Sequence, residues 1–105
     1  MYVIVWGFEV QAECQAELEH LYGPEGEWVR LFRRGAGYLG SELHRSVEGR
    51  RHYLTLDRWR SQGHYEAFRQ QHAAEYEALD RIGERLTERE VKIGTFVTLD
   101  GKGSA

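Results

Sequence analysis

The sequence predicts an α+β fold with the order β-α-β-β-α-β, a ferredoxin-like plan built on a four-stranded antiparallel sheet. Three observations support this prediction: short runs rich in β-branched and aromatic residues, two longer segments with helical periodicity, and a glycine turn between the two central strands. The 105 residues suit one domain, which we place at residues 1–99, followed by a flexible tail of small residues at 100–105.

The composition limits the class of protein and its partners. Hydrophobic residues make up 41% of the chain, the formal charge is −3 and the pI is near 5.9. This acidity disfavours nucleic acid as a partner, and no apolar run approaches the ~20 residues of a bilayer-spanning helix. Cys14 is the single cysteine, so no internal disulfide forms. A lone thiol suits a reducing compartment, and we expect a cytoplasmic protein with no membrane partner.

The first strand and the first helical region follow from the residue pattern. Residues 3–10 are almost continuously apolar, as in a strand covered on both faces. Residues 13–34 show helical spacing that is interrupted by GPEG around Pro24, the only proline. Two glycines beside a proline break a helix, so we expect two helical pieces, the second beginning near Pro24.

Residues 38–47 and 51–59 are predicted to pair as a hairpin, with Glu48 and Gly49 as a two-residue turn. That turn sets Tyr38 opposite Trp59 and His44 opposite Tyr53. The two sides of the hairpin then divide its residues into two sets. One face carries Leu39, Ser41, Leu43, Leu54 and Leu56, and the other carries Tyr38, Glu42, His44, Tyr53, Thr55, Asp57 and Trp59. A slip of one residue would reassign these faces.

The last predicted elements are a long helix over 62–86, with Ser61 as its N-cap, and a strand over 90–99. One stripe recurs every three or four residues along the helix: Tyr65, Phe68, His72, Tyr76, Leu79, Ile82 and Leu86. Helices on one side of the sheet leave its other face uncovered, although the first strand is apolar on both faces. A second copy of the chain is the simplest cover, so a homodimer is predicted.

Five segments together resemble the antibiotic biosynthesis monooxygenase (ABM) domain family of the dimeric α/β-barrel superfamily. They are the hydrophobic first strand, GYLGSELHR, YLTLDRW, YEAFRQQHAAEYEAL and LTEREVKIG, and the resemblance spans residues 2–99. It implies a dimer whose sheets pack face to face, with a pocket between sheet and helices in each subunit. Some members are cofactor-independent monooxygenases acting on polyphenolic or quinol-like substrates, and others degrade haem.

The resemblance carries over only to some residues. Oxygenating members place an Asn and a Trp four apart on the third strand, with a Tyr in the next helix. Trp59 and Tyr65 match the Trp and the Tyr, but Thr55 stands at the Asn position. Haem-degrading members use an Asn on the first strand and a Trp and a His in the second helix. Phe68 lies near that Trp position and the spacing of His72 differs, so haem degradation is the less favoured third option.

Cofactor-free oxygenation needs an aromatic cage and a base that forms an electron-rich phenolate or carbanion. His72 suits the base because histidine titrates near neutral pH. The predicted catalytic set is therefore His72, Tyr65 and Trp59. The alternative for His72 is a structural hydrogen bond to a strand residue such as Glu42. The predicted ligand-binding residues come mainly from the hairpin and the helical stripe: Tyr38, His44, Tyr53, Thr55, Phe68, Tyr76 and Trp28.

These observations favour a cofactor-independent monooxygenase-like protein for a small aromatic, quinol-like or polyphenol-like substrate. Thr55 at the Asn position favours the alternative, a non-catalytic ligand-binding or interaction protein on the same dimeric scaffold. No His-x-His, HExxH or paired Cys/His spacing is present, so we expect no metal site. The resemblance to cofactor-independent members implies that no cofactor is needed. The segment RRHYLTLDRW does not match the signature of an RNA-recognition strand, which disfavours an RNA-binding domain with the same strand order.

Overall fold

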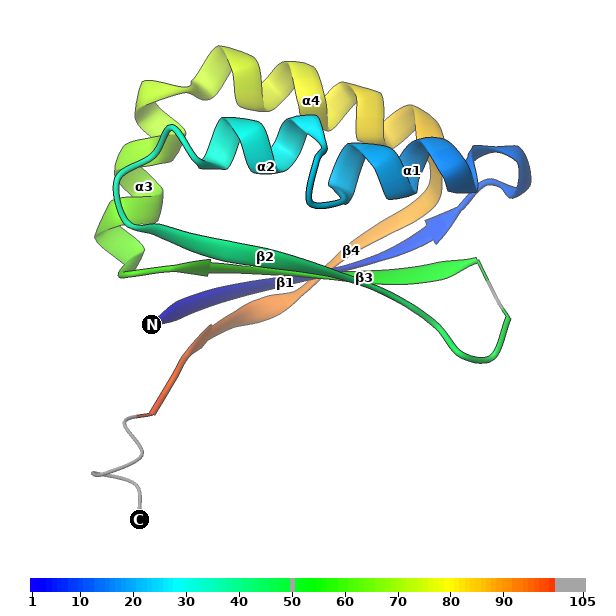
Figure 1. The fold of residues 1–105 in the computed structure, drawn as a ribbon, viewed down its shortest axis with the longest axis horizontal. Coiled ribbons are helices and arrows are strands. Elements are labelled where there is room, and N and C mark those ends of the chain that lie inside the picture. The colour runs from blue at the N-terminus through cyan, green and yellow to red at the C-terminus, as the bar shows by residue number, and fades with distance from the viewer. Residues whose placement is uncertain (50, 100–105) are drawn as a thin grey trace.

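The computed structural model describes residues 1–49 and 51–99 (Figure 1). The elements in chain order are β1 (Tyr2–Val10), the 3-10 helix η1 (Ala12–Cys14), α1 (Gln15–Tyr22), α2 (Glu27–Phe32), β2 (Tyr38–Arg45), β3 (His52–Trp59), α3 (Gln62–Gln71), α4 (Ala73–Leu86) and β4 (Thr87–Val97). The predicted β-α-β-β-α-β order is confirmed. The predicted tail at 100–105 lies outside the described residues.

The strands form one antiparallel sheet in the order β2-β3-β1-β4, as the predicted plan requires. All the helices lie on one face of this sheet, and Figure 1 shows the opposite face uncovered. The core fills the space between the helices and the sheet, where Ile4, Phe8 and Val10 of β1 are at most 4% exposed. Burial of each such side chain contributes about 1.5–3 kcal/mol to folding.

The first helical region breaks where GPEG predicted a break. α1 ends at Tyr22, and α2 begins at Glu27 rather than near Pro24. The turn is closed by the Gly26 N–H, which donates to the Gly23 carbonyl at 3.0 Å. Only glycine fits at 26, because a Cβ there would overlap the His20 and Leu21 carbonyl oxygens. This close backbone contact delays the start of α2 past the proline.

The helix predicted over 62–86 is instead two helices that meet at His72. This residue has φ −123° and ψ 32°, outside the helical region, so α3 ends before it and α4 begins after it. Its N–H still donates to the Phe68 carbonyl, and its carbonyl still accepts from the Tyr76 N–H, both at 2.9 Å. The stripe therefore continues across the kink. Ser61 is confirmed as the N-cap, since its side chain accepts from the His64 N–H.

One of the two residue pairs predicted for the hairpin is confirmed and the other is wrong. Tyr38 lies opposite Trp59, but His44 lies opposite Leu54 rather than Tyr53. The register shifts between Tyr38 and Gly40, and Gly40 has φ +141°, a conformation that favours glycine. From residue 41 onward, each β2 side chain therefore lies on the face of the sheet opposite to the one predicted for it.

The predicted two-residue turn at Glu48 and Gly49 is also wrong. The Ser46 N–H donates to the His52 carbonyl at 2.9 Å, so the loop between the strands is longer than two residues. The longer loop accommodates the one-residue shift of β2 against β3. This shift brings Ser41 to the same, helix-facing side of the sheet as Asp57, where the two side chains form a hydrogen bond.

The uncovered face of the sheet carries apolar side chains. On β4, Val91, Ile93 and Phe96 are 39%, 52% and 51% exposed. Phe96 pairs with Val3 of β1, and Gly7 of β1 packs against the Ile93 side chain. Among the described helices, none is long and apolar enough to cross a membrane.

Candidate functional site

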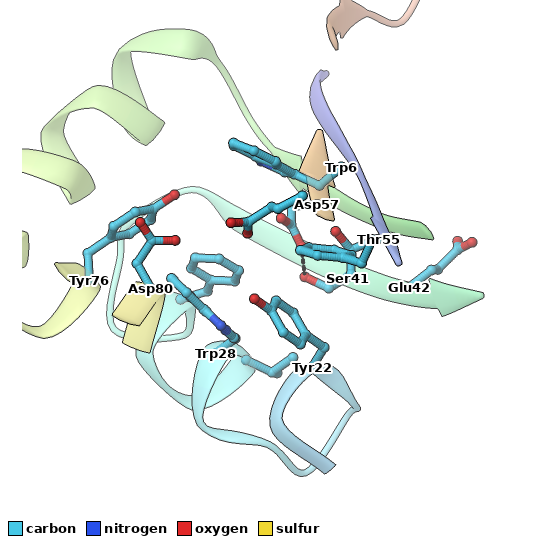
Figure 2. A pocket seen from close by; sticks show the side chains of 13 residues that line it. Trp6, Tyr22, Trp28, Ser41, Glu42, Thr55, Asp57, Tyr76 and Asp80 are labelled. Atoms are coloured by element: carbon cyan, nitrogen blue, oxygen red, sulfur yellow. Dashed lines mark hydrogen bonds between the residues drawn. The ribbon is translucent and has the colours of Figure 1, made fainter. Parts of the chain in front are cut away.

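A cavity lies between the helix-facing side of the sheet and helices α1, α2 and α4 (Figure 2). Its volume is about 30 Å³, far below the roughly 300–1,000 Å³ of small-ligand sites. A ligand ring must therefore part the side chains to enter. The walls are predominantly aromatic: Trp6, Phe8, Tyr22, Trp28, Phe32 and Tyr76.

The aromatic walls come from elements far apart in the sequence. Trp28 of α2 anchors one side, with its ring 4.9 Å from Tyr76 of α4 in an edge-on arrangement and 6.0 Å from Tyr22 of α1 in a stacked one. The buried Trp28 Nε1 makes no well-formed hydrogen bond among the described residues, although it lies near enough to the Tyr22 hydroxyl to lower the pKa of that group. An unpaired buried donor costs about 1–3 kcal/mol, so Trp28 offers a hydrogen bond to an acceptor that enters the cavity.

Asp57 is the central polar group of the cavity. It projects from β3, and Figure 2 shows its carboxyl directed toward the side where Tyr76 and Asp80 of α4 lie. Ser41 of β2 donates to its Oδ1 at 2.7 Å, and the Tyr38 hydroxyl lies 2.7 Å from the Ser41 hydroxyl. Because the Ser41 proton faces Asp57, Tyr38 is the donor in the second bond.

Burial raises the pKa of Asp57 to about 6, and the Ser41 hydrogen bond opposes that rise in part. The carboxylate is thus ionised at neutral pH with a conjugate acid close to neutrality, which is the property of an efficient general base. Burial also raises the pKa of Tyr38, which keeps the far end of this hydrogen-bond chain protonated.

Two further carboxylates line the cavity, Asp80 from α4 and Glu90 from β4. Burial raises the pKa of Glu90 to about 7, with the negative charges of Asp80 and Glu84 adding to the effect. Burial and then the Glu84 charge raise the pKa of Asp80, while Arg69 lowers it. No Lys, Arg or His lines the cavity within residues 1–49 and 51–99. No group of three His, Cys, Asp or Glu side chains in that part of the chain is placed to hold a metal ion.

Three predicted ligand-binding residues line the cavity: Trp28, Thr55 and Tyr76. Thr55 is 5% exposed and lies on β3 beside Asp57, two residues along the same face. Tyr38 reaches the cavity indirectly, through its hydrogen bond to Ser41. These four predictions therefore converge on one site.

Trp59, Tyr65 and Phe68 form an aromatic cluster outside the cavity lining. Trp59 is 0% exposed, with its ring 5.0 Å from Phe68 and 5.6 Å from Tyr65. Gly35 packs directly on Trp59 and Phe68, since a Cβ there would lie 2.9 Å from each ring. Of the predicted catalytic residues, Trp59 thus sits in the core between β3 and α3, and the partly buried Tyr65 packs against it.

His72 also lies away from the cavity, at the kink between α3 and α4. Its ring is 5.3 Å from Phe68, and its buried Nδ1 lies 3.6 Å from the Glu75 carboxylate, too far for a hydrogen bond. The alternative partner, Glu42, is on β2 and pairs with Arg58 and His44 instead. His72 therefore makes neither the cavity contact nor the strand contact considered for it.

His44 and Tyr53 point to opposite sides of the sheet. His44 is exposed on the uncovered face, 2.7 Å from Glu42, beside a shallow hollow that Gly7, Leu54 and Ile93 also line. The Tyr53 hydroxyl faces α1, where it donates to the Glu19 carboxylate and accepts from Gln15 at 3.2 Å. The shifted hairpin register is the reason that these two predicted ligand-binding residues separate.

Ten of the thirteen cavity residues were not predicted as site residues, among them Trp6, Tyr22, Asp57, Asp80 and Glu90. A signal existed for two of them. Asp57 is the one acidic residue on the strand face that also carries Tyr53, Thr55 and Trp59, and Asp80 follows Tyr76 by one helical turn. Glu90 carries no such signal, because its place depends on the pairing of β4 with Phe8 of β1.

Comparisons with known proteins agree with this architecture. The family model described as antibiotic biosynthesis monooxygenase matches residues 1–75. SnoaB, a cofactor-independent oxygenase from Streptomyces nogalater, superposes with a TM-score of 0.75 at 17% identity, covering 94% of this chain and 93% of SnoaB. A putative antibiotic biosynthesis monooxygenase from Bordetella bronchiseptica gives 0.71 at 19% identity, covering 93% of this chain and 96% of its own.

A third structure, a putative antibiotic biosynthesis monooxygenase from Deinococcus radiodurans, gives a TM-score of 0.66 at 16% identity, covering 96% of this chain and 100% of its own. Comparison with curated protein sequences finds no match. At these identities the solved structures establish the fold alone. The family model covers well over half of the 105 residues, and the fold is that of the solved members. The chain therefore belongs to the antibiotic biosynthesis monooxygenase family.

Proposed function

We propose that this protein is a cofactor-independent, monooxygenase-like enzyme that oxidises a small aromatic substrate in the cavity between sheet and helices. The observation that carries the proposal is the buried carboxyl of Asp57, whose pKa is raised to about 6 inside an aromatic-walled cavity and which Ser41 holds by a hydrogen bond. Family membership supports the reaction class, as does the likeness to SnoaB, which is a cofactor-independent oxygenase.

The chemistry balances with dioxygen as the sole oxidant. Asp57 accepts a proton from a ring CH₂ group in the keto form of a phenolic or quinol-like substrate, which leaves an electron-rich, phenolate-type anion. Dioxygen then bonds as a peroxide to that same carbon, which now bears one hydrogen. Loss of water from the resulting peroxide converts that carbon to a carbonyl. One oxygen atom enters the product and the other leaves as water, so no external reductant is consumed. Asp57 then returns its proton to the departing oxygen.

The other polar groups of the cavity fit supporting roles. The Trp28 N–H, which makes no well-formed hydrogen bond among the described residues, can donate to the substrate oxygen on which negative charge develops. Ser41, held by Tyr38, orients the Asp57 carboxyl and stabilises its ionised form. This proposal places the base at Asp57 rather than at His72, because only Asp57 lines the cavity.

Oxygen uptake with a reduced anthracene-type phenol such as dithranol tests the base assignment. Asp57→Asn keeps the shape of the side chain and removes the proton acceptor, so uptake is expected to fall about 100-fold or more. His72→Ala is the matched comparison and is expected to retain activity. Loss of activity in His72→Ala with retention in Asp57→Asn would overturn the assignment and return the base to the helix kink.

A second function, ligand binding without turnover, is favoured by one observation. Oxygenating relatives are expected to carry an amide side chain where Thr55 stands, and no Asn or Gln lines the cavity in the described part of the chain. Tight binding of an aromatic ligand by the wild-type protein, with no oxygen consumed, would support this function over oxygenation.

We also propose that two copies associate through the uncovered face of the sheet. Val91, Ile93 and Phe96 expose apolar surface there, beside Val3 of β1. A partner sheet packed on this face removes that surface from water, which is the main driving force for such association. Native mass spectrometry tests the proposal, with a dimer expected and a monomer at micromolar concentration contradicting it. A cytoplasmic location stays a prediction.

A further inference from the structure

We propose that the cavity takes an aromatic ligand that carries a protonated amine, with the ammonium group held between Asp80 and Glu90. As a statement of substrate class this rests on the proposed oxygenase function. As a statement about binding it stands on the charges and rings of the cavity alone.

The first observation is an excess of acidic groups that form no ion pair within the described part of the chain, although the Arg69 charge acts on Asp80 from a distance and lowers its pKa. Asp57, Asp80 and Glu90 enter the cavity from β3, α4 and β4. A fourth acidic residue, Glu42, also borders the cavity, but Figure 2 shows its side chain pointing away, and its carboxylate pairs with Arg58. The three remaining carboxylates form no ion pair with any described residue.

The cations nearby are used elsewhere or lie outside. Arg69 of α3 donates to the Tyr65 hydroxyl at 3.2 Å, and its guanidinium lies 3.8 Å from the centre of the Tyr76 ring. Lys92 of β4 pairs with Trp6 on the sheet but is exposed and does not line the cavity. The ligand is therefore the source of positive charge that this site lacks.

The second observation is the set of aromatic rings around the carboxylates. Trp6, Tyr22 and Trp28 surround the space into which Asp57 is directed (Figure 2). The faces of such rings attract cations as well as flat apolar ligands. The Arg69 guanidinium on the Tyr76 ring is an instance of the same attraction at the edge of this site. An aromatic amine satisfies both features, with its ring among the aromatic walls and its ammonium beside the acidic groups.

The electrostatics of the empty cavity agree with this assignment. Burial and the neighbouring charges of Asp80 and Glu84 raise the pKa of Glu90 to about 7, and the pKa of Asp57 rises to about 6 for want of solvation. A bound ammonium ion stabilises the ionised carboxylates and reverses part of these rises. A neutral phenol gains no such energy, and an aromatic carboxylate meets like charges.

A matched series of three ligands tests the proposal by isothermal titration calorimetry at about pH 8, where the carboxylates are ionised. The ligands are 2-naphthylmethylamine, 2-naphthylmethanol and 2-naphthoate, which share one ring system and differ in charge. The amine is expected to bind at least about tenfold more tightly than the alcohol, and the naphthoate most weakly. Failure of the amine to bind, or binding no tighter than the alcohol, overturns the proposal.

Two variants separate this site from general attraction to an acidic protein. The double variant Asp80→Asn, Glu90→Gln is expected to remove the preference for the amine while leaving the affinity for the alcohol within about twofold. The matched control is Glu13→Gln, Glu17→Gln, which makes the same change in net charge at exposed positions near the start of α1. An equal loss of amine binding in both double variants refutes the cavity as the site.

Proton release gives a readout that surface binding does not. Near pH 6.5 Glu90 is partly protonated, so binding of the amine is expected to expel a fraction of a proton, whereas binding of the alcohol expels none. Titrations in two buffers of different ionisation enthalpy measure that release, and its absence overturns the role of Glu90.

None of these assays depends on turnover. Tight amine binding without any oxygen uptake contradicts the oxygenase proposal alone, and oxygen uptake without amine preference contradicts this inference alone.

Discussion

The Asp57→Asn substitution is expected to make the protein more stable as well as less active. In the folded protein, burial raises the pKa of Asp57 from its ordinary value of 3.8 to about 6. The folded state thus holds the proton more tightly than the unfolded chain does, and ionising the carboxyl at higher pH costs stability. A shift of this size corresponds to about 3 kcal/mol, since each pKa unit is worth about 1.4 kcal/mol.

The sign of the pH dependence follows from that shift. Below about pH 4 the carboxyl is protonated in both states and costs nothing. Between about pH 4 and pH 6 the unfolded chain loses its proton first, so the free energy of unfolding of the wild-type protein falls through this window. Above the folded-state pKa the full cost is present. The amide introduced by Asp57→Asn is uncharged at every pH, so the variant is expected to escape the loss.

The expected difference between variant and wild type is therefore close to zero at about pH 4 and about 2–3 kcal/mol in favour of the variant at about pH 8. The amide oxygen of the variant still accepts the Ser41 hydrogen bond, whereas its NH₂ group needs a new acceptor. The expected gain in the free energy of unfolding is therefore at the lower end of that range. Urea unfolding at one-unit steps of pH measures the difference, with Glu17→Gln as an exposed control.

Two outcomes would refute the reasoning. A stability difference that does not change with pH would show that Asp57 has an ordinary pKa in the folded protein. A variant less stable than the wild type at about pH 8 would show that the Asp57 carboxylate is well solvated or paired. Either result also removes the basis for assigning Asp57 as the base, because that assignment depends on the same raised pKa.

Three further predictions concern neighbouring features. Ser41→Ala removes the hydroxyl that stabilises the ionised Asp57, so the acid limb of the activity profile is expected to move to higher pH, and an unchanged limb would contradict the role of Ser41. Gly35→Ala places a methyl group 2.9 Å from the rings of Trp59 and Phe68 and is expected to lower the free energy of unfolding by about 1–3 kcal/mol, measured by denaturant; a neutral effect would mean that the cluster is loosely packed. Phe96→Glu puts a charge on the uncovered face and is expected to shift a dimer toward monomer by sedimentation, whereas an unaltered dimer would place the interface elsewhere.

The order and type of the elements were predictable because they depend on local patterns. The β-branched runs, the break at GPEG and the cap at Ser61 each act over a few residues, and the structure confirms each of them. The kink at His72 was not predictable from periodicity, because the stripe of inward-facing residues runs through it without interruption.

The candidate site was predictable only in part. Trp28, Thr55 and Tyr76, which the sequence predicts as ligand-binding residues, line the cavity because aromatic and buried positions recur with the period of their elements. His72 fell on the same stripe, yet it lies at the end that packs on Phe68 rather than over the cavity. Periodicity identifies the inner face of a helix, but it does not say which part of that face lies over a cavity.

The sequence alone determined the class of fold and the family, since hydrophobic period, turn residues and element order are local or additive properties. Only the tertiary structure decided which residues form the site. The one-residue shift at Gly40 turned Ser41 toward Asp57, and strand pairing brought Glu90 to the cavity that Asp80 enters from α4. Burial of these carboxyls together then raised their pKa values. The physical reason is that register and desolvation depend on contacts between distant segments, which no local pattern encodes.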